Sequence, residues 1–322
     1  MSLDIQRISH PDGVRRLAPE LADLQNRAGA DAPHYRPIAI EEIERRLRHD
    51  PRFRERAILV ARDDRGSVGW CHLEPVGMAL TGGDLYPYVG AHSVFAPGVP
   101  HVPDGEAYSA AVRGLLYAAC QIRAQQGAPT VELFTPEGSA AEDSLHAEGF
   151  QPVDAWATYV AGLSGARAGR APLHVSSVPR SEVDRLPRVL REAGLLDREF
   201  TPGDLSALSE AAGNLDSQGL LIAETGGSVV GYAAVMADDA YSAATGRQRA
   251  WIGFGPLGMG ALPGPEQMER FATLLSAARI SAFCRGAVEL AFVASAEGHQ
   301  PGIWAERGFG IEARWRRWRT EL

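Results

Sequence analysis

The sequence contains no lysine, so each of its 32 basic residues is an arginine. Arginine codons are rich in G and C, and we interpret the bias as an effect of genome composition. Only three cysteines occur, Cys71, Cys120 and Cys284, far apart and in no C-x-x-C pattern. This spacing excludes a disulfide framework. Neither these cysteines nor the nine histidines have the spacing of metal ligands, so we expect no metal cofactor.

Long apolar segments are also absent. No run of 18 apolar residues occurs, so the sequence predicts no membrane-spanning helix and no membrane partner. Residues 1–19 are polar and lack an apolar h-region, which predicts no signal peptide. Reduced thiols are typical of the cytoplasm, where we expect the protein to reside. The net charge of −8 argues against a nucleic-acid partner.

What the chain does contain is an ordinary globular composition, with 45% hydrophobic and 22% charged residues over 322 positions. This length fits two domains of roughly 150 residues each better than one. Each half begins with a short alternating segment, residues 3–8 and 173–178, followed by apolar residues at helical spacing. The pattern predicts a strand and an amphipathic helix at both places.

The repeat continues through a glycine-bearing turn between two apolar runs. The runs are residues 58–61 and 68–70 in the first half and 220–223 and 230–232 in the second. Such a pair predicts a β-hairpin. From Ala61 to Gly69 is eight residues, as from Ala223 to Gly231. The same landmarks in the same order indicate a duplication.

A further strand, residues 92–96 or 251–255, ends at a proline in each half. From Pro97 to Gly149 is 52 residues, and from Pro256 to Gly308 is also 52. Between these landmarks we predict a long helix (106–126, 266–285), a strand (130–134, 288–292) and a shorter helix, and then a last strand near 150–160 or 309–318. We therefore predict an α/β protein with two mixed sheets. Its domains are residues 1–163 and 172–322, joined by a linker over 164–171 that is rich in small residues.

This order resembles the GNAT superfamily of acyl-CoA N-acyltransferases. The resemblance rests on the valine-glycine-aromatic segments at Val68 and Val230, the prolines that end the fourth strands, and the Gly-Phe pairs at Gly149 and Gly308. It covers nearly all of both halves, and its strength lies in order and spacing. It implies two tandem GNAT-like folds, in each of which the fourth and fifth strands splay apart to admit the pantetheine arm of an acyl-CoA.

The resemblance also implies that the loop after the fourth strand holds the pyrophosphate of acetyl-CoA or another acyl-CoA. The first half's loop has prolines at 97, 100 and 103, each of which removes an N–H donor. It also has an acidic residue, Asp104, which would repel the pyrophosphate. The second half's loop keeps three glycines after Pro256, so its backbone can approach a phosphate. Both loops depart from the family's pattern. The implied acyl-CoA contacts are Phe254, Pro256, Gly258, Met259, Gly260, Ala261 and Gly264, with Val94 and Gly105 in the first half.

The family's acid is often a tyrosine four residues before the Gly-Phe glycine, where this chain has Leu145 and Trp304. Neither is a useful proton donor. Ser295 and His299 are the alternative candidates in the second half, against roles as a helix cap and a solvated histidine. His92 is the candidate general base because an unperturbed histidine titrates near neutrality, and its ordinary alternative is a sheet histidine.

Two motifs suggest other functions. Gly253 to Gly258 fits G-x-G-x-x-G, but Pro256 and Pro265 keep it from leading directly into a helix, which disfavours a dinucleotide site. Residues 314–319 interleave arginine with tryptophan, which could stack on single-stranded nucleic acid. At this net charge we favour a final strand with packed tryptophans and outward arginines.

The sequence thus predicts an N-acyltransferase that moves an acetyl or related group from acyl-CoA to a small-molecule amine. The partners expected are that acceptor and, at most, a second copy of the chain, so a monomer or a homodimer. The alternative is a degenerate, non-catalytic pair of GNAT folds that serves as a binding or scaffold protein.

Overall fold

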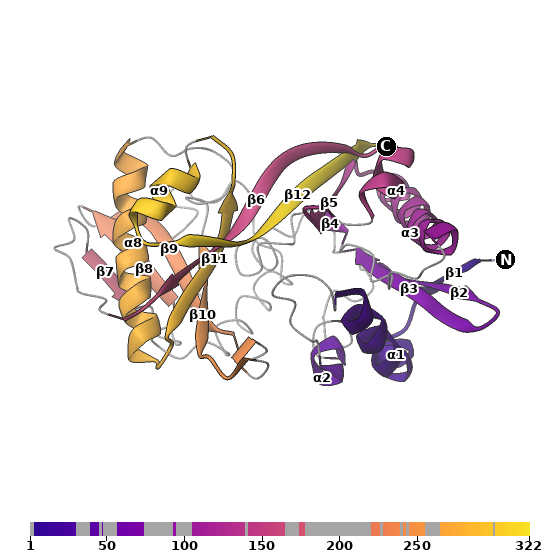
Figure 1. Cartoon of the computed structure of the whole chain (residues 1–322), viewed down its shortest axis with the longest axis horizontal. Coiled ribbons are helices and arrows are strands. Elements are labelled where there is room, and N and C mark those ends of the chain that lie inside the picture. Colours follow the sequence, from indigo (N-terminus) through magenta and orange to yellow (C-terminus); the bar gives the residue numbers. More distant parts are fainter. Residues whose placement is uncertain are drawn as a thin grey trace. The chain divides into compact units, whose positions relative to one another are not determined.

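The structure, a computed structural model, describes residues 3–29, 39–44, 47, 57–73, 93–94, 105–138, 141–164, 174–177, 220–225, 228–238, 241–242, 245–254, 265–298 and 300–322. These residues form two compact units (Figure 1). Among the described residues, the first unit comprises residues up to 155 together with 313–322, and the second comprises 156–312.

The sheet of the first unit has the order β1-β2-β3-β4-β5-β12. All neighbours are antiparallel except β4 and β5, which run parallel. The strands are β1 (Asp4–Ile8), β2 (Ala57–Asp63), β3 (Gly66–Leu73), β4 (Ser93–Val94), β5 (Thr130–Pro136) and β12 (Gly310–Glu321).

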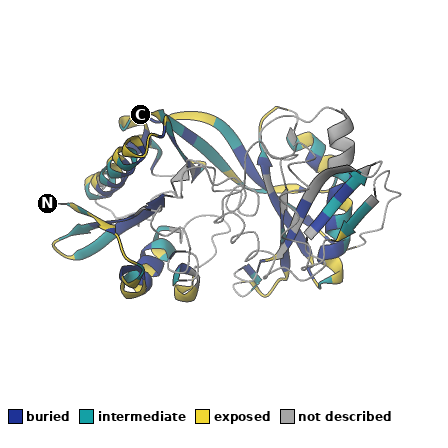
Figure 2. Cartoon of the chain, turned by 180° about the vertical axis from the view of Figure 1, so that it is seen from behind, coloured by how far each residue is buried: buried dark blue, intermediate teal, exposed yellow. Residues whose placement is uncertain are grey.

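Helices cover both faces of this sheet, as the alternation of strand side chains requires. Ile58 and Val60 of β2 pack in one cluster with α1 (Pro11–Gly29) and α2 (Ile40–Ile43). Leu59 and Ala61 pack on the other face with α3 (Gly105–Gln125) and α4 (Glu142–Ala147). In Figure 2, α1 and α3 are buried on one side and exposed on the other, which is the pattern of amphipathic helices.

The sheet of the second unit has the order β7-β8-β9-β10-β11-β6. Here too every pair is antiparallel except β10 and β11, which are parallel. One face packs on α8 (Pro265–Cys284) and α9 (Gln300–Glu306). The strands are β7 (His174–Ser177), β8 (Leu220–Thr225), β9 (Ser228–Ala237), β10 (Arg249–Phe254), β11 (Glu289–Ser295) and β6 (Gln151–Gly162).

The described strands of the two units are two parts of one twelve-stranded sheet, in which β12 and β6 are neighbours, so the prediction of two separate sheets is wrong. The two parts have one topology, which confirms the predicted α/β class with two tandem mixed-sheet folds. Their directions agree strand by strand, and a register irregularity follows Ala61 in one hairpin and Ala223 in the other. The last strands, β6 and β12, are 12 residues each. Both long helices and both predicted hairpins lie where the spacing placed them.

The two last strands are exchanged between the units. β6, which ends the first half of the sequence, pairs with β11, and β12 pairs with β5. The predicted domains 1–163 and 172–322 divide the chain as a sequence, whereas each unit in space is completed by the other half's last strand. Of the predicted linker over 164–171, only Ser164 is described, so that linker stays a prediction.

Charge complementarity favours the placement of β12. Arg317 Nε lies 3.0 Å from Asp154 Oδ1, and Arg319 Nε lies 2.6 Å from Glu132 Oε1. Arg316 forms ion pairs with both Glu137 and Glu142, each at 3.3 Å. By contrast β11, the strand of β12's own half, carries one acidic residue, at its first position. β12 therefore gains several partly buried ion pairs, whose partners include Glu132 of β5 and Asp154 of β6.

Trp318 shows why the arginine-tryptophan ending is a packed strand. Its side chain is fully buried, its Nε1 donates to Thr135 Oγ1 at 2.9 Å, and its ring meets His146 edge-on at 4.9 Å. The packing interpretation of residues 314–319 is confirmed for this tryptophan. The predicted outward arginines are not found, because Arg316, Arg317 and Arg319 are half-buried in ion pairs.

A second cluster holds the first residues of β12 in the second unit. The buried Arg249 guanidinium lies 2.6 and 2.7 Å from the two carboxylate oxygens of Glu312, and 3.1 Å from Glu289. It also lies 3.5 Å from the ring centroid of Tyr241. Burial lowers the pKa of Arg249, but the hydrogen bonds and charge of its two glutamates outweigh burial and leave that pKa raised.

We expect Glu312→Gln to destabilise the protein by about 1.5–3 kcal/mol, because hydrogen bonds to a buried charge are lost. Urea denaturation followed by circular dichroism measures the change. Glu306→Gln, at an exposed position of α9, is the matched control and should stay within about 0.5 kcal/mol of wild type. Equal effects of the two substitutions would contradict the role of the cluster.

The three cysteines should differ in reactivity. Burial, and then the neighbouring Cys120, raise the pKa of the Cys71 thiol far above its usual range. Burial and Glu148 raise the pKa of Cys120 to about 11. Cys284 is exposed. At pH 8 a disulfide reagent should therefore modify one thiol rapidly, and the other two only in denaturant, because the thiolate is the reactive form. Fast modification that persists in Cys284→Ser would show this assignment to be wrong.

Candidate functional site

The parallel strands of the second unit separate at their carboxyl ends. β10 pairs with β11 from Arg249 to Trp251, opposite Glu289 to Ala291. Beyond that point β10 continues to Phe254 against β9, and β11 continues to Ser295 against β6. β10 stays paired with β9 and β11 stays paired with β6, whereas the ladder between β10 and β11 stops. The ladder of the second unit thus ends in the region where the sequence resemblance implies that the two strands splay apart.

The backbone groups that face this gap follow from the ladder bonds. The Glu289 N–H donates to the Gln248 carbonyl on the β10 side, so by alternation Ala291, Val293 and Ser295 present their backbone groups toward β10. The Arg249 carbonyl accepts from the Asp238 N–H on the β9 side. Ile252 and Phe254 therefore face β11 across the gap. An extended ligand between the strands would meet N–H and C=O groups on both sides.

An aromatic cluster lies at the open end of β11. The Tyr159 ring stacks on Phe292, with centroids 5.5 Å apart, and lies 6.2 Å from the ring of Trp304. All three side chains are buried. The Tyr159 hydroxyl donates to the Ser295 backbone carbonyl at 2.9 Å. A residue of the first half thus reaches the strand end beside the gap.

Of the catalytic candidates, the structure describes Ser295. It is the last residue of β11, half-buried, and its Oγ accepts from the Glu297 N–H at 3.2 Å. This bond to the N–H two residues on is a local turn, and α9 begins only at Gln300, so Ser295 is not the helix cap that the sequence offered as its ordinary alternative. His92 and His299 lie outside the described residues, so their roles stay predictions.

The acyl-CoA candidates lie mostly in the undescribed loop. Phe254 is the last residue of β10, Val94 ends β4, and Gly105 is the first residue of α3. These three stand at the predicted points of the strand–loop–helix connection. The remaining candidates lie outside the described residues: Pro256, Gly258, Met259, Gly260, Ala261 and Gly264.

Tyr159 was missed by the sequence analysis, which sought the second half's proton donor within the second half. Trp304, at the position where a tyrosine was sought, does lie in the buried cluster. Tyr159 is distant in sequence and arrives only because β6 is exchanged. A signal was available: the strand that ends the first half carries a tyrosine among its buried residues.

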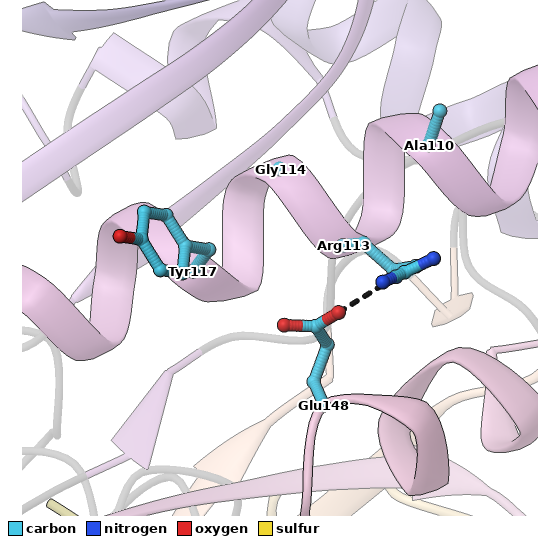
Figure 3. Close-up of a pocket in the computed structure, with 5 residues that line it drawn as sticks. All are labelled: Ala110, Arg113, Gly114, Tyr117 and Glu148. Carbon is cyan, nitrogen blue, oxygen red and sulfur yellow. Dashed lines mark hydrogen bonds and ion pairs between the residues drawn. The ribbon is translucent and has the colours of Figure 1, made fainter.

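A separate pocket of about 380 Å³ lies on α3 of the first unit. Figure 3 shows the Arg113 and Glu148 side chains turned toward one another, with Nε and Oε1 2.6 Å apart. Tyr117 is largely exposed there. None of the predicted site residues lines this pocket, and its two charged groups already neutralise one another. We assign no chemistry to it.

Metal and membrane features were sought among the same described residues. No cluster of three or more histidine, cysteine, aspartate or glutamate side chains there could hold a metal ion. None of the described helices is both long and apolar enough to cross a bilayer.

No protein-family model matches the sequence, and no curated protein matches it. Solved structures do match. A GCN5-related N-acetyltransferase from Sphaerobacter thermophilus is 18% identical, with a TM-score of 0.66 over 99% of this chain and 95% of that one. A tandem GNAT protein from the clavulanic acid biosynthesis pathway is 16% identical, with a TM-score of 0.59 over 99% and 98% of the two chains.

A more distant match is the N-myristoyltransferase of Saccharomyces cerevisiae, solved with bound myristoyl-CoA. It is 10% identical, with a TM-score of 0.59 over all of this chain and 79% of that one. Identities this low establish the fold alone. Together with the topology and the splayed strand pair, they show that the chain has the fold of the GNAT superfamily, in two tandem copies.

Proposed function

We propose that the protein is an acyl-CoA-dependent N-acyltransferase, transferring an acetyl or related acyl group to the amine of a small molecule. The observation that carries the proposal is the separation of β10 from β11 after Trp251, in a fold whose solved examples include an acyltransferase with an acyl-CoA bound. We further propose that the protein acts in the cytoplasm as a monomer or homodimer.

The proposed cleft of the second unit suits an acyl-CoA. The pantetheine arm is extended and carries amide groups, which match the gap-facing backbone of Phe254 and Val293. The pyrophosphate would lie on the backbone N–H groups between Pro256 and Gly264, ahead of α8, which begins at Pro265. A helix N-terminus favours an anion there.

In the proposed reaction the acceptor's amine attacks the carbonyl carbon of the thioester. The C–N bond forms, the C–S bond breaks, the amine loses a proton and the departing thiolate gains one. We propose His92 as the base. We propose Ser295, the last residue of β11, or His299, four residues further along the sequence, as the acid. The acceptor site is left open, since such sites are built from variable loops.

The alternative is a non-catalytic GNAT-fold protein that binds a ligand or a partner. It is favoured by the proline-rich first loop and by Leu145 and Trp304, which occupy the positions of the family's usual acid. Both of these side chains are buried in their units' cores, which accounts for them as packing residues.

Binding of acetyl-CoA should depend on the second loop. We expect isothermal titration calorimetry to detect acetyl-CoA binding to wild type, and Gly260→Val/Gly264→Val to weaken it at least tenfold. Each lost N–H to phosphate hydrogen bond costs about 1.5–3 kcal/mol. The matched control is Gly98→Val/Gly105→Val, which should bind as wild type does.

The opposite pattern would move the cofactor site to the first unit. No binding by wild type would exclude acyl transfer and leave the non-catalytic alternative.

Turnover separates the two functions if binding is found. With acetyl-CoA and a panel of primary amines, release of the free thiol should be faster with one acceptor than with water. His92→Ala should lower kcat by about 10²–10⁴-fold, the usual contribution of a general base. Ser295→Ala and His299→Ala test the acid in the same assay. Binding without acceptor-dependent thiol release would support the non-catalytic alternative.

A further inference from the structure

We propose that Tyr159 is a positioning residue of the second unit's cleft, supplied by the first half of the chain. Its hydroxyl holds the Ser295 carbonyl, and thereby the open end of β11, at the separation from β10 that a pantetheine arm requires. The inference rests on the proposed function, because it assumes that this gap receives the arm of an acyl-CoA.

The side chains around Tyr159 fix the direction of its hydroxyl. Tyr159 lies opposite Phe292 in the β6–β11 ladder, so both rings emerge on the same face of the sheet. Stacking on Phe292 and contact with Trp304 fix a ring that has no exposed surface. A buried hydroxyl must find an acceptor. The acceptor here is a main-chain oxygen three positions further along β11, where the ladder with β10 has already ended.

The bond from Tyr159 is accepted on the edge of β11 that faces the gap. Ser295 belongs to the alternate set of β11 residues whose backbone faces β10. Beyond Ala291 the β10 ladder no longer fixes this set. The β6 ladder holds β11 from its other side as far as Ser295. The bond from Tyr159 adds a restraint on the gap-facing side, at the Ser295 carbonyl.

The first unit contains the equivalent aromatic residue with a different bond. Trp318 of β12 lies opposite Leu133, as Tyr159 lies opposite Phe292, and each belongs to the last strand of the other half. The Trp318 Nε1 donates to the Thr135 side-chain oxygen, not to the main chain. A donor therefore recurs at the same place in both units. In the second unit its bond acts on the backbone of the gap-facing strand, which favours the second unit as the acyl-CoA site.

The proposal makes the first half part of the second unit's binding site. Acyl-CoA affinity would then depend on Tyr159, which does not itself contact the ligand. Tyr159 belongs to the first half of the sequence, whereas the predicted contacts of the second loop belong to the second half.

The experiment compares Tyr159→Phe with Thr135→Val in the full chain. Tyr159→Phe removes the hydroxyl bonded to Ser295. Thr135→Val removes the acceptor of the equivalent bond in the first unit at nearly constant volume. Each variant is titrated calorimetrically with acetyl-CoA and with adenosine 3′,5′-bisphosphate, which has the nucleotide's 3′-phosphate but no pantetheine arm. Thermal unfolding of each variant is recorded in parallel.

We expect Tyr159→Phe to weaken acetyl-CoA about tenfold, the effect of one hydrogen bond, and to leave the bisphosphate unchanged. Thr135→Val should leave both affinities unchanged. 4-Aminophenylalanine at position 159, which restores a donor, should recover most of the acetyl-CoA affinity, and this variant keeps the test valid if Tyr159→Phe proves unstable.

Unchanged acetyl-CoA affinity in Tyr159→Phe, or equal losses for both ligands, would overturn the inference while leaving the proposed function intact. Equal losses in the Thr135→Val control would overturn it as well. If wild type binds no acetyl-CoA, the proposed function itself fails, and the inference fails with it.

Discussion

Every strand edge in these two sheets presents backbone N–H and C=O groups that must be paired or hydrated. β5 and β11 are the edges on which the two units depend, because each pairs with the last strand of the other half. Once β6 covers β11 and β12 covers β5, the cores beneath them are closed by residues of mixed origin, with Trp318 in one and Tyr159 in the other. The halves of the sequence are then inseparable parts of both units.

This constraint has consequences for folding. The pairing of β5 with β12 brings Thr130 against Glu321, almost two hundred positions apart, so the first unit closes only when the end of the chain is available. Ion pairs stabilise β12 in both units, since Glu312 binds Arg249 in the second unit and Arg317 binds Asp154 in the first.

The features that the sequence predicted, and those that it missed, show what a sequence can specify. Periodicity and the repeated spacing from Pro97 and Pro256 were sufficient for the helices and strands, because these depend on neighbours within a few residues. The exchange was not predicted, because an alternating strand fits any edge of suitable polarity. Its signal was the density of arginine in residues 314–319 opposite Glu132, Glu137 and Glu142, which the sequence analysis interpreted only as an outward face. Tyr159 was missed for the same reason, since its role depends on the exchange.

The absence of a tyrosine at Trp304 weighs less against catalysis than it first suggests. A thiol has an ordinary pKa near 8.5, so a thiolate is a stable leaving group close to neutral pH and needs little help from an acid. A protonated acceptor amine is different, because it must lose a proton before its nitrogen can form a bond. Replacing the acid by a packing residue therefore costs the reaction less than loss of the base would. In the proposed reaction, a base beside the acceptor therefore matters more than an acid at the position of Trp304.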